Sequence, residues 1–253
     1  MRITFLGTGT SSGVPRIACD CDVCRSTDPR NHRLRCSLLI EHDGRALVID
    51  TPPDLRTQSL RQGLRRLDAL LFTHAHADHL YGLDDVRCFR LEEREPLPCY
   101  ADARTRERIA VVFDYAFRGG HPSSVPQLAL HDAETPTTLW GLPVQPIPVL
   151  HGRLPVLGYR FGRFAYVTDC SAIPPASMAL LGGVEVLVLG ALRHREHPTH
   201  FNVEQALAAI ATIGPRHAWL THIAHDLDHE ATEACLPAQV RLAYDGLSLE
   251  LEP

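Results

Sequence analysis

The segment from Thr73 to His79 carries the strongest chemical signal in the chain. It reads Thr-His-Ala-His-Ala-Asp-His, so His74, His76, Asp78 and His79 lie within six residues. Neutral imidazole is the commonest metal ligand in proteins. Because side chains alternate along an extended segment, His74 and His76 can point the same way, while Asp78 and His79 diverge from them. The spacing predicts two metal ions rather than one, and it disfavours the alternative of a solvated polar turn.

A second cluster of potential ligands is formed by Cys19, Cys21 and Cys24, in the pattern Cys-x-Cys-x-x-Cys. The flanking aspartates and Arg16 favour an exposed position, where clustered thiols oxidise unless they are bound. A closed structural zinc site needs four ligands, usually cysteine with histidine, so a fourth ligand must come from elsewhere in the chain. A redox-sensing thiol cluster is the alternative. We expect the other cysteines, which are scattered, at core or chemically neutral positions.

The elements that must position these residues are short apolar strands. Several of the runs have no polar alternation, as expected for strands covered on both faces. Seven runs predict strands, at residues 3–6, 37–40, 46–49, 69–72, 164–168, 184–189 and 218–221. A helix is predicted from Asn202, as N-cap, to Gly214, and another over 104–118, whereas 119–148 reads as a surface loop rich in proline and glycine. Strands mixed with helices predict a layered α/β fold.

Further candidate ligands lie close to the ends of these strands. His74, Asp169 and His222 each follow a predicted strand within three residues. Loops at strand ends are where α/β proteins usually place functional side chains, because the sheet holds those positions rigidly. Asp50 also ends a strand, where it either accepts a hydrogen bond from a ligand imidazole and fixes its tautomer, or caps a turn. Taken alone, His151 or Asp169 is more often an ordinary loop residue than a ligand.

The composition excludes several classes of protein. The chain has 253 residues, of which 45% are hydrophobic and 22% charged, so disorder is not its dominant state. Its net charge of −5 gives no general attraction to nucleic acid or anionic membranes. No apolar run is long enough for a transmembrane helix, and the N-terminal stretch fits a first strand better than a signal peptide. We expect one cytoplasmic domain over residues 1–253.

The sequence resembles the metallo-β-lactamase fold hydrolases, whose signature is the His-x-His-x-Asp-His pattern found at residues 74–79. The resemblance implies an αββα sandwich of four layers for nearly the whole chain. It also implies two divalent cations, which the mixed imidazole and carboxylate ligands suggest are Zn²⁺ or Mn²⁺. In that arrangement one cation is held by His74, His76 and His151, the other by Asp78, His79 and His222, and Asp169 bridges the two.

Within these hydrolases the chain is similar to the PhnP family. The similarity rests on Gly7-Thr8-Gly9 with Gly13-Val14-Pro15, on the three-cysteine pattern, and on Thr221-His222-Ile223-x-His225 late in the chain. It implies a small phosphodiester substrate such as phosphoribosyl 1,2-cyclic phosphate, and it suggests a homodimer. It also implies a structural zinc ion that ties the first loop to the last loop of the active site. The ligands of that ion are Cys19, Cys21, Cys24 and His225.

A second histidine-rich stretch, at residues 193–200, directly precedes the predicted Asn202 helix. Phosphodiesterases of this superfamily, including ribonuclease Z, carry a histidine just ahead of a comparable helix, and His200 matches it. The resemblance implies that His200 is a general acid or a phosphate-binding group. Asp78 and Asp50 complete the set of candidate catalytic residues. Weaker candidates in the stretch are Arg193, His194, Arg195 and His197.

Charge arithmetic favours hydrolysis of an anionic ester. Two divalent cations bring four positive charges, of which two aspartates and a bridging hydroxide remove three. The remaining positive charge suits attack by a metal-activated hydroxide on a phosphodiester. Asp84, Asp85 and Arg87 either bind ribose hydroxyls or form a surface ion-pair network. The alternatives are an RNA-processing nuclease of the ribonuclease Z type, a hydrolase of another ester, and a non-catalytic metal-binding accessory protein resembling PqqB. The acidic chain, without a long glycine-rich insertion, makes nucleic acid an unlikely partner.

Overall fold

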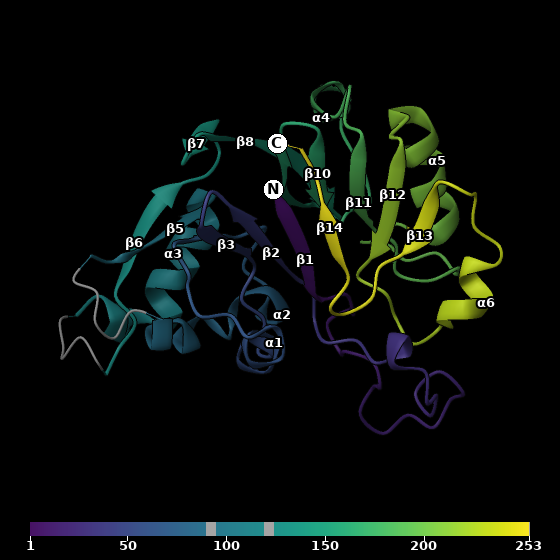
Figure 1. Cartoon of the computed structure of the whole chain (residues 1–253), viewed down its shortest axis with the longest axis horizontal. Coiled ribbons are helices and arrows are strands. Elements are labelled where there is room, and N and C mark those ends of the chain that lie inside the picture. Colours follow the sequence, from purple (N-terminus) through teal and green to yellow (C-terminus); the bar gives the residue numbers. More distant parts are fainter. Residues whose placement is uncertain (90–94, 119–123, 253) are drawn as a thin grey trace.

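The structure is a computed structural model that describes residues 1–89, 95–118 and 124–252. Within these residues, two seven-stranded sheets pack face to face, and helices cover the outer face of each sheet (Figure 1). The predicted αββα sandwich is therefore confirmed. None of the helices in the described residues has the length and apolar character needed to cross a bilayer.

The first sheet has the strand order β14-β1-β2-β3-β4-β5-β6. Strands β1, β2 and β3 form an antiparallel meander, and β3 to β6 run parallel to one another. The strand bounds are β1 Arg2–Gly7, β2 Ser37–His42, β3 Arg45–Ile49, β4 Ala69–Leu71, β5 Leu97–Ala101, β6 Leu128–Asp132 and β14 Ser248–Glu250. The parallel half of this sheet carries β3 and β4, which end next to Asp50 and the 74–79 motif.

The second sheet has the strand order β13-β12-β11-β10-β9-β8-β7. Strands β10 to β13 are parallel, whereas β7 to β10 pair antiparallel. The strand bounds are β7 Thr137–Leu139, β8 Leu142–His151, β9 Leu154–Phe161, β10 Phe164–Val167, β11 Val186–Gly190, β12 His217–Thr221 and β13 Val240–Leu242. The ends of β8, β10 and β12 meet the end of the first sheet that carries the 74–79 motif.

The helices follow the strands as short connections. The α-helices are α1 Leu55–Gln62, α2 Ala77–Leu80, α3 Ala103–Val112, α4 Pro175–Leu180, α5 Val203–Ile213 and α6 His229–Glu233. The 3₁₀ helices are η1 Pro29–Asn31, η2 Leu83–Phe89 and η3 Asp114–Ala116. Apolar side chains of α1 to α3 pack on the first sheet, and those of α5 pack on the second.

The core between the two sheets is rich in aromatic side chains. Phe5, Tyr159, Phe164 and Tyr166 are almost completely buried there. Aromatic rings bury about 150–250 Å² each, so a few of them fill much of the space between two sheets. Tyr159 also uses its hydroxyl group, which donates a 2.6 Å hydrogen bond to the carbonyl oxygen of Phe72. This contact anchors the backbone directly before the 74–79 motif.

All seven predicted strands are present, each with bounds within two residues of the prediction. They were recognisable because both of their faces are covered, so almost every residue is apolar. The predicted loop over 119–148, in contrast, is wrong for residues 128–148, which contain β6, β7 and most of β8; residues 119–123 lie outside the described residues. Pro146 and Pro148 of β8 are tolerated because β7 pairs only with Leu142–Val144 and ends before they are reached.

The helix predicted over 104–118 divides into α3 and the 3₁₀ helix Asp114–Ala116. The Asn202 helix is confirmed at both ends. The side chain of Asn202 accepts a hydrogen bond from the Gln205 backbone, and the Gln205 side chain accepts one from the Asn202 backbone, which together form a capping box. Gly214 ends the helix with a φ of +69°.

We predict that Asn202→Ala lowers the free energy of unfolding by about 1 kcal/mol, because it removes the N-cap acceptor of α5. Chemical denaturation followed by circular dichroism measures the change. Thr212→Ala is the matched control on the same helix, since its exposed hydroxyl contacts only the Ala208 carbonyl oxygen. An equal effect of both substitutions would contradict the role assigned to the cap.

Candidate metal centre and active site

Five side chains of the predicted centre lie where strands end. Asp50, Asp169 and His222 follow β3, β10 and β12, His74 follows β4, and His151 is the last residue of β8. The first three have φ values of +64°, +48° and +59°, in the left-handed region. This conformation costs non-glycine residues about 1–3 kcal/mol, and such strain is typical of functional sites. At Asp50, Asp169 and His222, the chain turns sharply out of its sheet.

The 74–79 motif changes conformation in its middle. His76 is extended and serves as the N-cap residue of α2, so Asp78 and His79 already belong to that helix. His74 and His76 consequently point to one side, where His74 Nε2 and His76 Nδ1 are 2.9 Å apart. Asp78 and His79 point to another side, where His79 Nε2 lies 3.3 Å from Asp78 Oδ2. The predicted divergence of the two pairs is present.

Asp169 lies between these two pairs and touches both. Its Oδ2 is 3.9 Å from His74 Nε2 and 4.0 Å from His151 Nε2. Its Oδ1 is 3.3 Å from both His79 Nε2 and His222 Nε2. The ligand-type atoms therefore form two groups, each within 4.8 Å, that share this one carboxylate. One group is His74, His76, His151 and Asp169, and the other is Asp78, His79, His222 and Asp169.

Buried nitrogen atoms without hydrogen-bond partners indicate, independently of the residue types, that the cluster suits divalent cations. The Nε2 atoms of His79 and His222 are buried and form no hydrogen bond, although carboxylate oxygens lie nearby. A buried polar atom without a partner costs about 1–3 kcal/mol, and a bound cation would satisfy it. Although burial favours the neutral carboxyl group, the surrounding histidines hold the pKa of Asp78 and Asp169 below its usual range. The cluster thus offers imidazole and anionic carboxylate to a divalent metal.

The Nδ1 atoms of His74, His79 and His151 form hydrogen bonds that orient these three rings. His79 Nδ1 donates to Asp50 Oδ2 at 2.7 Å, and His151 Nδ1 donates to the Thr199 carbonyl oxygen at 2.7 Å. Thr73 Oγ1 donates to Asp50 and accepts from His74 Nδ1 at 3.0 Å. Because each Nδ1 carries the proton, each Nε2 presents its lone pair to the cluster.

Asp50 lies behind this cluster and contacts His79, the placement expected of a residue that positions this ring. It is fully buried and accepts hydrogen bonds from the backbone and the hydroxyl group of Thr73 as well as from His79. Burial raises its pKa, and these partners oppose the shift. The sequence analysis did not include Thr73 or Thr199 in the site. Thr73 is adjacent to the motif and was detectable, whereas the Thr199 contribution is a backbone carbonyl that carries no sequence signal.

His200 lies at the open side of the cluster. Its ring stacks on that of His222 with centroids 4.7 Å apart, and its Nδ1 is 4.0 Å from Asp169 Oδ2. Burial and the neighbouring His222 lower the pKa of His200 to about 3, so the ring is neutral at neutral pH. A neutral imidazole still offers one N–H donor and one acceptor.

The weaker candidates have other partners. His194 is exposed and pairs with Glu204 at 2.9 Å, and the Arg193 side chain donates to backbone carbonyls of its own loop. His197 lies 5.1 Å from His200 between ring centroids, whereas no contact assigns a role to Arg195. For Asp84 and Arg87, which follow the 74–79 motif, the structure agrees with the alternative of a surface ion-pair network. Asp84 pairs with Arg87 at 3.1 Å, and it accepts a hydrogen bond from the Tyr115 hydroxyl group.

The cysteine cluster assembles around His225. The Nδ1 atom of His225 lies 3.4 Å from Cys19 Sγ and 3.2 Å from Cys21 Sγ, and Cys24 Sγ is within 4.8 Å of the other ligand atoms. Three thiols and one imidazole are a complete ligand set for a closed tetrahedral site. Next to this cluster, Ile223 exchanges backbone hydrogen bonds with Thr8 and Thr10. The loop that carries His222 is thereby joined to the first loop of the chain.

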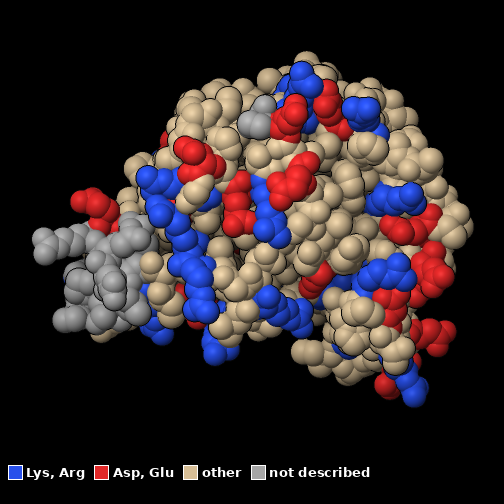
Figure 2. All heavy atoms as spheres, viewed as in Figure 1, with Lys and Arg blue, Asp and Glu red and all other residues tan. Residues whose placement is uncertain are grey.

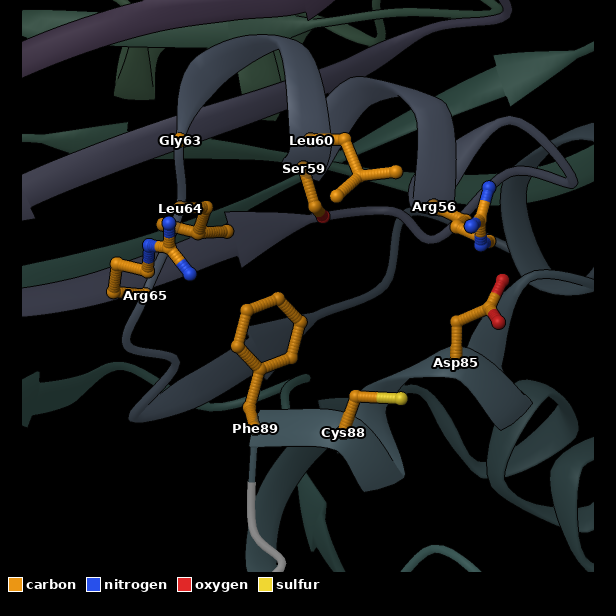
Figure 3. A pocket seen from close by; sticks show the side chains of 9 residues that line it. All are labelled: Arg56, Ser59, Leu60, Gly63, Leu64, Arg65, Asp85, Cys88 and Phe89. Carbon is orange, nitrogen blue, oxygen red and sulfur yellow. The ribbon is translucent and has the colours of Figure 1, made fainter.

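Two cavities lie among the helices that cover the first sheet, and one of them adjoins the ligand-type residues. One, of about 250 Å³, has His74 and His76 in its wall and opens beside the first ligand group. The other, of about 360 Å³, lies between α1 and η2 and is lined by none of the predicted metal ligands, although Asp85, a candidate for binding ribose hydroxyls, lies in its wall (Figure 3). In that cavity Arg56 faces Asp85 across the opening, with Leu60 and Phe89 nearby. The smaller cavity, which adjoins the ligands, is the one that a substrate can use.

Comparison with known proteins identifies the family. Residues 45–223 match the beta-lactamase superfamily domain. A crystal structure of a diphosphatase from the PhnP family superposes with a TM-score of 0.93 at 44% sequence identity, and the match covers 99% of this chain and 98% of that chain. The chain belongs to the PhnP family of the beta-lactamase superfamily. The resemblance inferred from the motifs is therefore confirmed.

Two further relatives have names that differ from that of the PhnP family. An octanoyltransferase from Porphyromonas gingivalis (strain ATCC BAA-308 / W83) is 40% identical over 254 residues. The match covers 98% of this chain but 51% of that protein, so the chain spans about half the length of this relative. Zn²⁺-bound PqqB from Methylobacterium extorquens superposes with a TM-score of 0.78 at 22% identity, covering 99% of this chain and 100% of that chain. That likeness concerns the fold.

We predict that Asp50→Asn lowers the affinity of the centre for metal by about 10–100-fold, because the substitution keeps the shape but weakens the hold on His79. Metal content after dialysis against a weak chelator, measured by inductively coupled plasma mass spectrometry, tests this. Asp132→Asn, at a carboxylate that belongs to neither ligand group, is the control. Metal retention equal to that of the unmodified protein would contradict the positioning role.

We also predict that Cys21→Ser lowers both the zinc content and the melting temperature, while hydrolysis by the folded fraction changes little. The reason is that the thiolate would be lost from a cluster that joins two loops without touching substrate. Cys235→Ser is the matched control, because Cys235 is exposed. Zinc content unchanged by Cys21→Ser would remove the assignment of a structural site.

Proposed function

We propose that this protein is a metal-dependent phosphodiesterase that hydrolyses a small cyclic phosphate ester, such as phosphoribosyl 1,2-cyclic phosphate. The observation that carries the proposal is the sharing of Asp169 between two groups of ligand-type side chains. A shared carboxylate suits two divalent cations, Zn²⁺ or Mn²⁺, placed side by side. The diphosphatase from the PhnP family, with its match to nearly the whole chain, supports phosphoryl chemistry at this centre.

The residues of the centre would have different roles in such a hydrolysis. When bound, the cations supply Lewis-acid stabilisation of the phosphoryl oxygens and lower the pKa of a water molecule from 15.7 to about 7. Asp169 and Asp78 offset part of the positive charge and leave a net attraction for an anionic ester. His200 is placed to donate its N–H as a hydrogen bond to a phosphoryl oxygen or to the leaving oxygen.

We further propose that Cys19, Cys21, Cys24 and His225 hold a structural Zn²⁺ ion. The support is the convergence of their ligand atoms and the ordinary preference of zinc for mixed thiolate and imidazole sets. Its role would be to fix the loop that carries His222, since His225 lies three residues further along the same loop. The ion would thus act on the active site through the backbone alone.

A small substrate is favoured over RNA by the distribution of charge. Arginines and carboxylates are interspersed over the face that Figure 2 shows, and the net charge is −5. RNA binding relies on broad positive surfaces that release counterions from the phosphate backbone. The complete set of ligands also speaks against a metal-binding accessory protein that turns nothing over.

We predict metal-dependent hydrolysis of bis(p-nitrophenyl) phosphate, with added Mn²⁺ or Zn²⁺, and at least about 100-fold lower turnover for Asp78→Ala, because a ligand is lost. Asp114→Ala, at an exposed ion pair with Arg118, is the matched control and should behave as the unmodified protein. Release of p-nitrophenolate measures the rate. Absence of metal-dependent turnover in every form would favour the accessory protein, and cleavage of precursor tRNA but not of cyclic ribose phosphates would favour the nuclease.

A further inference from the structure

The cavity of about 360 Å³ between α1 and η2 is separate from the metal centre, because no metal ligand lines it. Its volume lies within the range of about 300–1,000 Å³ that is usual for sites of small ligands. In Figure 3 the Arg65 side chain lies on one side of the Phe89 ring. Arg56 and Asp85 lie on the other side of that ring (Figure 3). The cavity thus presents charged groups at both ends of an apolar centre.

The two walls of this cavity start from one fixed junction, at the residues before α1. The Thr51 N–H donates a 2.7 Å hydrogen bond to the His79 carbonyl oxygen, and the Thr51 carbonyl oxygen accepts one of 2.9 Å from the Gly82 N–H. Gly82 approaches the Pro52 backbone so closely that an added Cβ would lie 2.0 Å from its carbonyl oxygen. Because α1 and η2 both follow this junction, the cavity is preformed, and a ligand can bind without ordering its walls.

The charged groups of the cavity are available to a ligand. Arg56 and Arg65 are exposed, and within the described residues neither forms an ion pair. Asp85 is the carboxylate in the wall, and in that part of the chain it also has no ion-pair partner. Two guanidinium groups and one carboxylate leave a net positive charge, which favours an anion. Arg61, in contrast, belongs to α1 but does not line the cavity and lies 4.0 Å from Asp245.

The apolar centre of the cavity suits a flat ring. Leu60, whose side chain is 66% exposed, and Phe89 both contribute to its wall. Stacking of a nucleobase on an aromatic side chain is worth about 1–3 kcal/mol. Beside that surface, Arg56 offers donors and Asp85 offers acceptors, which is the combination that the hydrogen-bonding edge of a base or the hydroxyl groups of a sugar require. The guanidinium group of Arg65 can bind two phosphate oxygens at once.

We propose that this cavity binds a nucleoside monophosphate at a site separate from the metal centre. The base packs between Leu60 and Phe89, and the phosphate contacts Arg65. Arg56 and Asp85 form hydrogen bonds with the base edge or the sugar. The inference goes beyond the proposed function, because binding at this site requires no hydrolysis and no contact with the metal ligands.

The test is isothermal titration of the metal-loaded protein with adenosine 5′-monophosphate. Adenosine and ribose 5-phosphate should each bind at least about tenfold more weakly, because each lacks one of the two recognised parts. Arg65→Ala should weaken binding of the nucleotide about tenfold and leave adenosine unaffected. Phe89→Leu should weaken the nucleotide and adenosine alike, about tenfold, and leave ribose 5-phosphate unaffected. Arg61→Ala is the matched control, since it removes the same charge outside the cavity.

Three results would overturn the inference. The first is absence of binding by adenosine 5′-monophosphate, and the second is equal weakening by Arg61→Ala and Arg65→Ala. The third is binding that Asp78→Ala abolishes and Phe89→Leu leaves intact, which would place the nucleotide at the metal centre. If the expected binding pattern is found but phosphodiesters are not hydrolysed, the proposed function fails and the nucleotide site stands.

Discussion

The need to neutralise charge around one buried carboxylate governs the architecture of this protein. Asp169 is almost completely buried, and five imidazoles approach its two oxygens within 4.0 Å. Charged groups in a protein interior are costly unless they are paired or coordinate metal. The second carboxylate, Asp78, and the unpartnered nitrogen atoms of His79 and His222 indicate that divalent cations are the partners for which the cluster is built. The rest of the fold serves to bring these groups together.

Two devices hold the groups in place. The first is the sheet edge, where Asp50, Asp169 and His222 turn out of their strands through left-handed backbone conformations. The second is a set of hydrogen bonds that orients His74, His79 and His151, with Asp50 under His79 and a backbone carbonyl under His151. Such a shell limits motion of the ligands, which matters because catalytic geometry must be held within a fraction of an ångström.

The centre is closed on one side and open on the other, and this asymmetry decides what can react. The cysteine cluster and the backbone bonds of Ile223 close the side of the last loop. His200 stacks on His222, and the cavity of about 250 Å³ lies beside His74 and His76.

The sequence alone determined the chemistry but not the surroundings in which it takes place. The 74–79 motif, the three cysteines and the apolar strands were recognisable because their residues are close together in the chain and have strict local requirements. The strand β8 was missed, since its prolines are acceptable only at a sheet edge that the sequence does not display. The sharing of Asp169 by both ligand groups was expected from the family resemblance, whereas the Thr199 carbonyl under His151 and the cavity beside His74 and His76 were decided by the tertiary structure. Each of these depends on packing between segments distant in sequence, and no local pattern of residue types records how such segments meet.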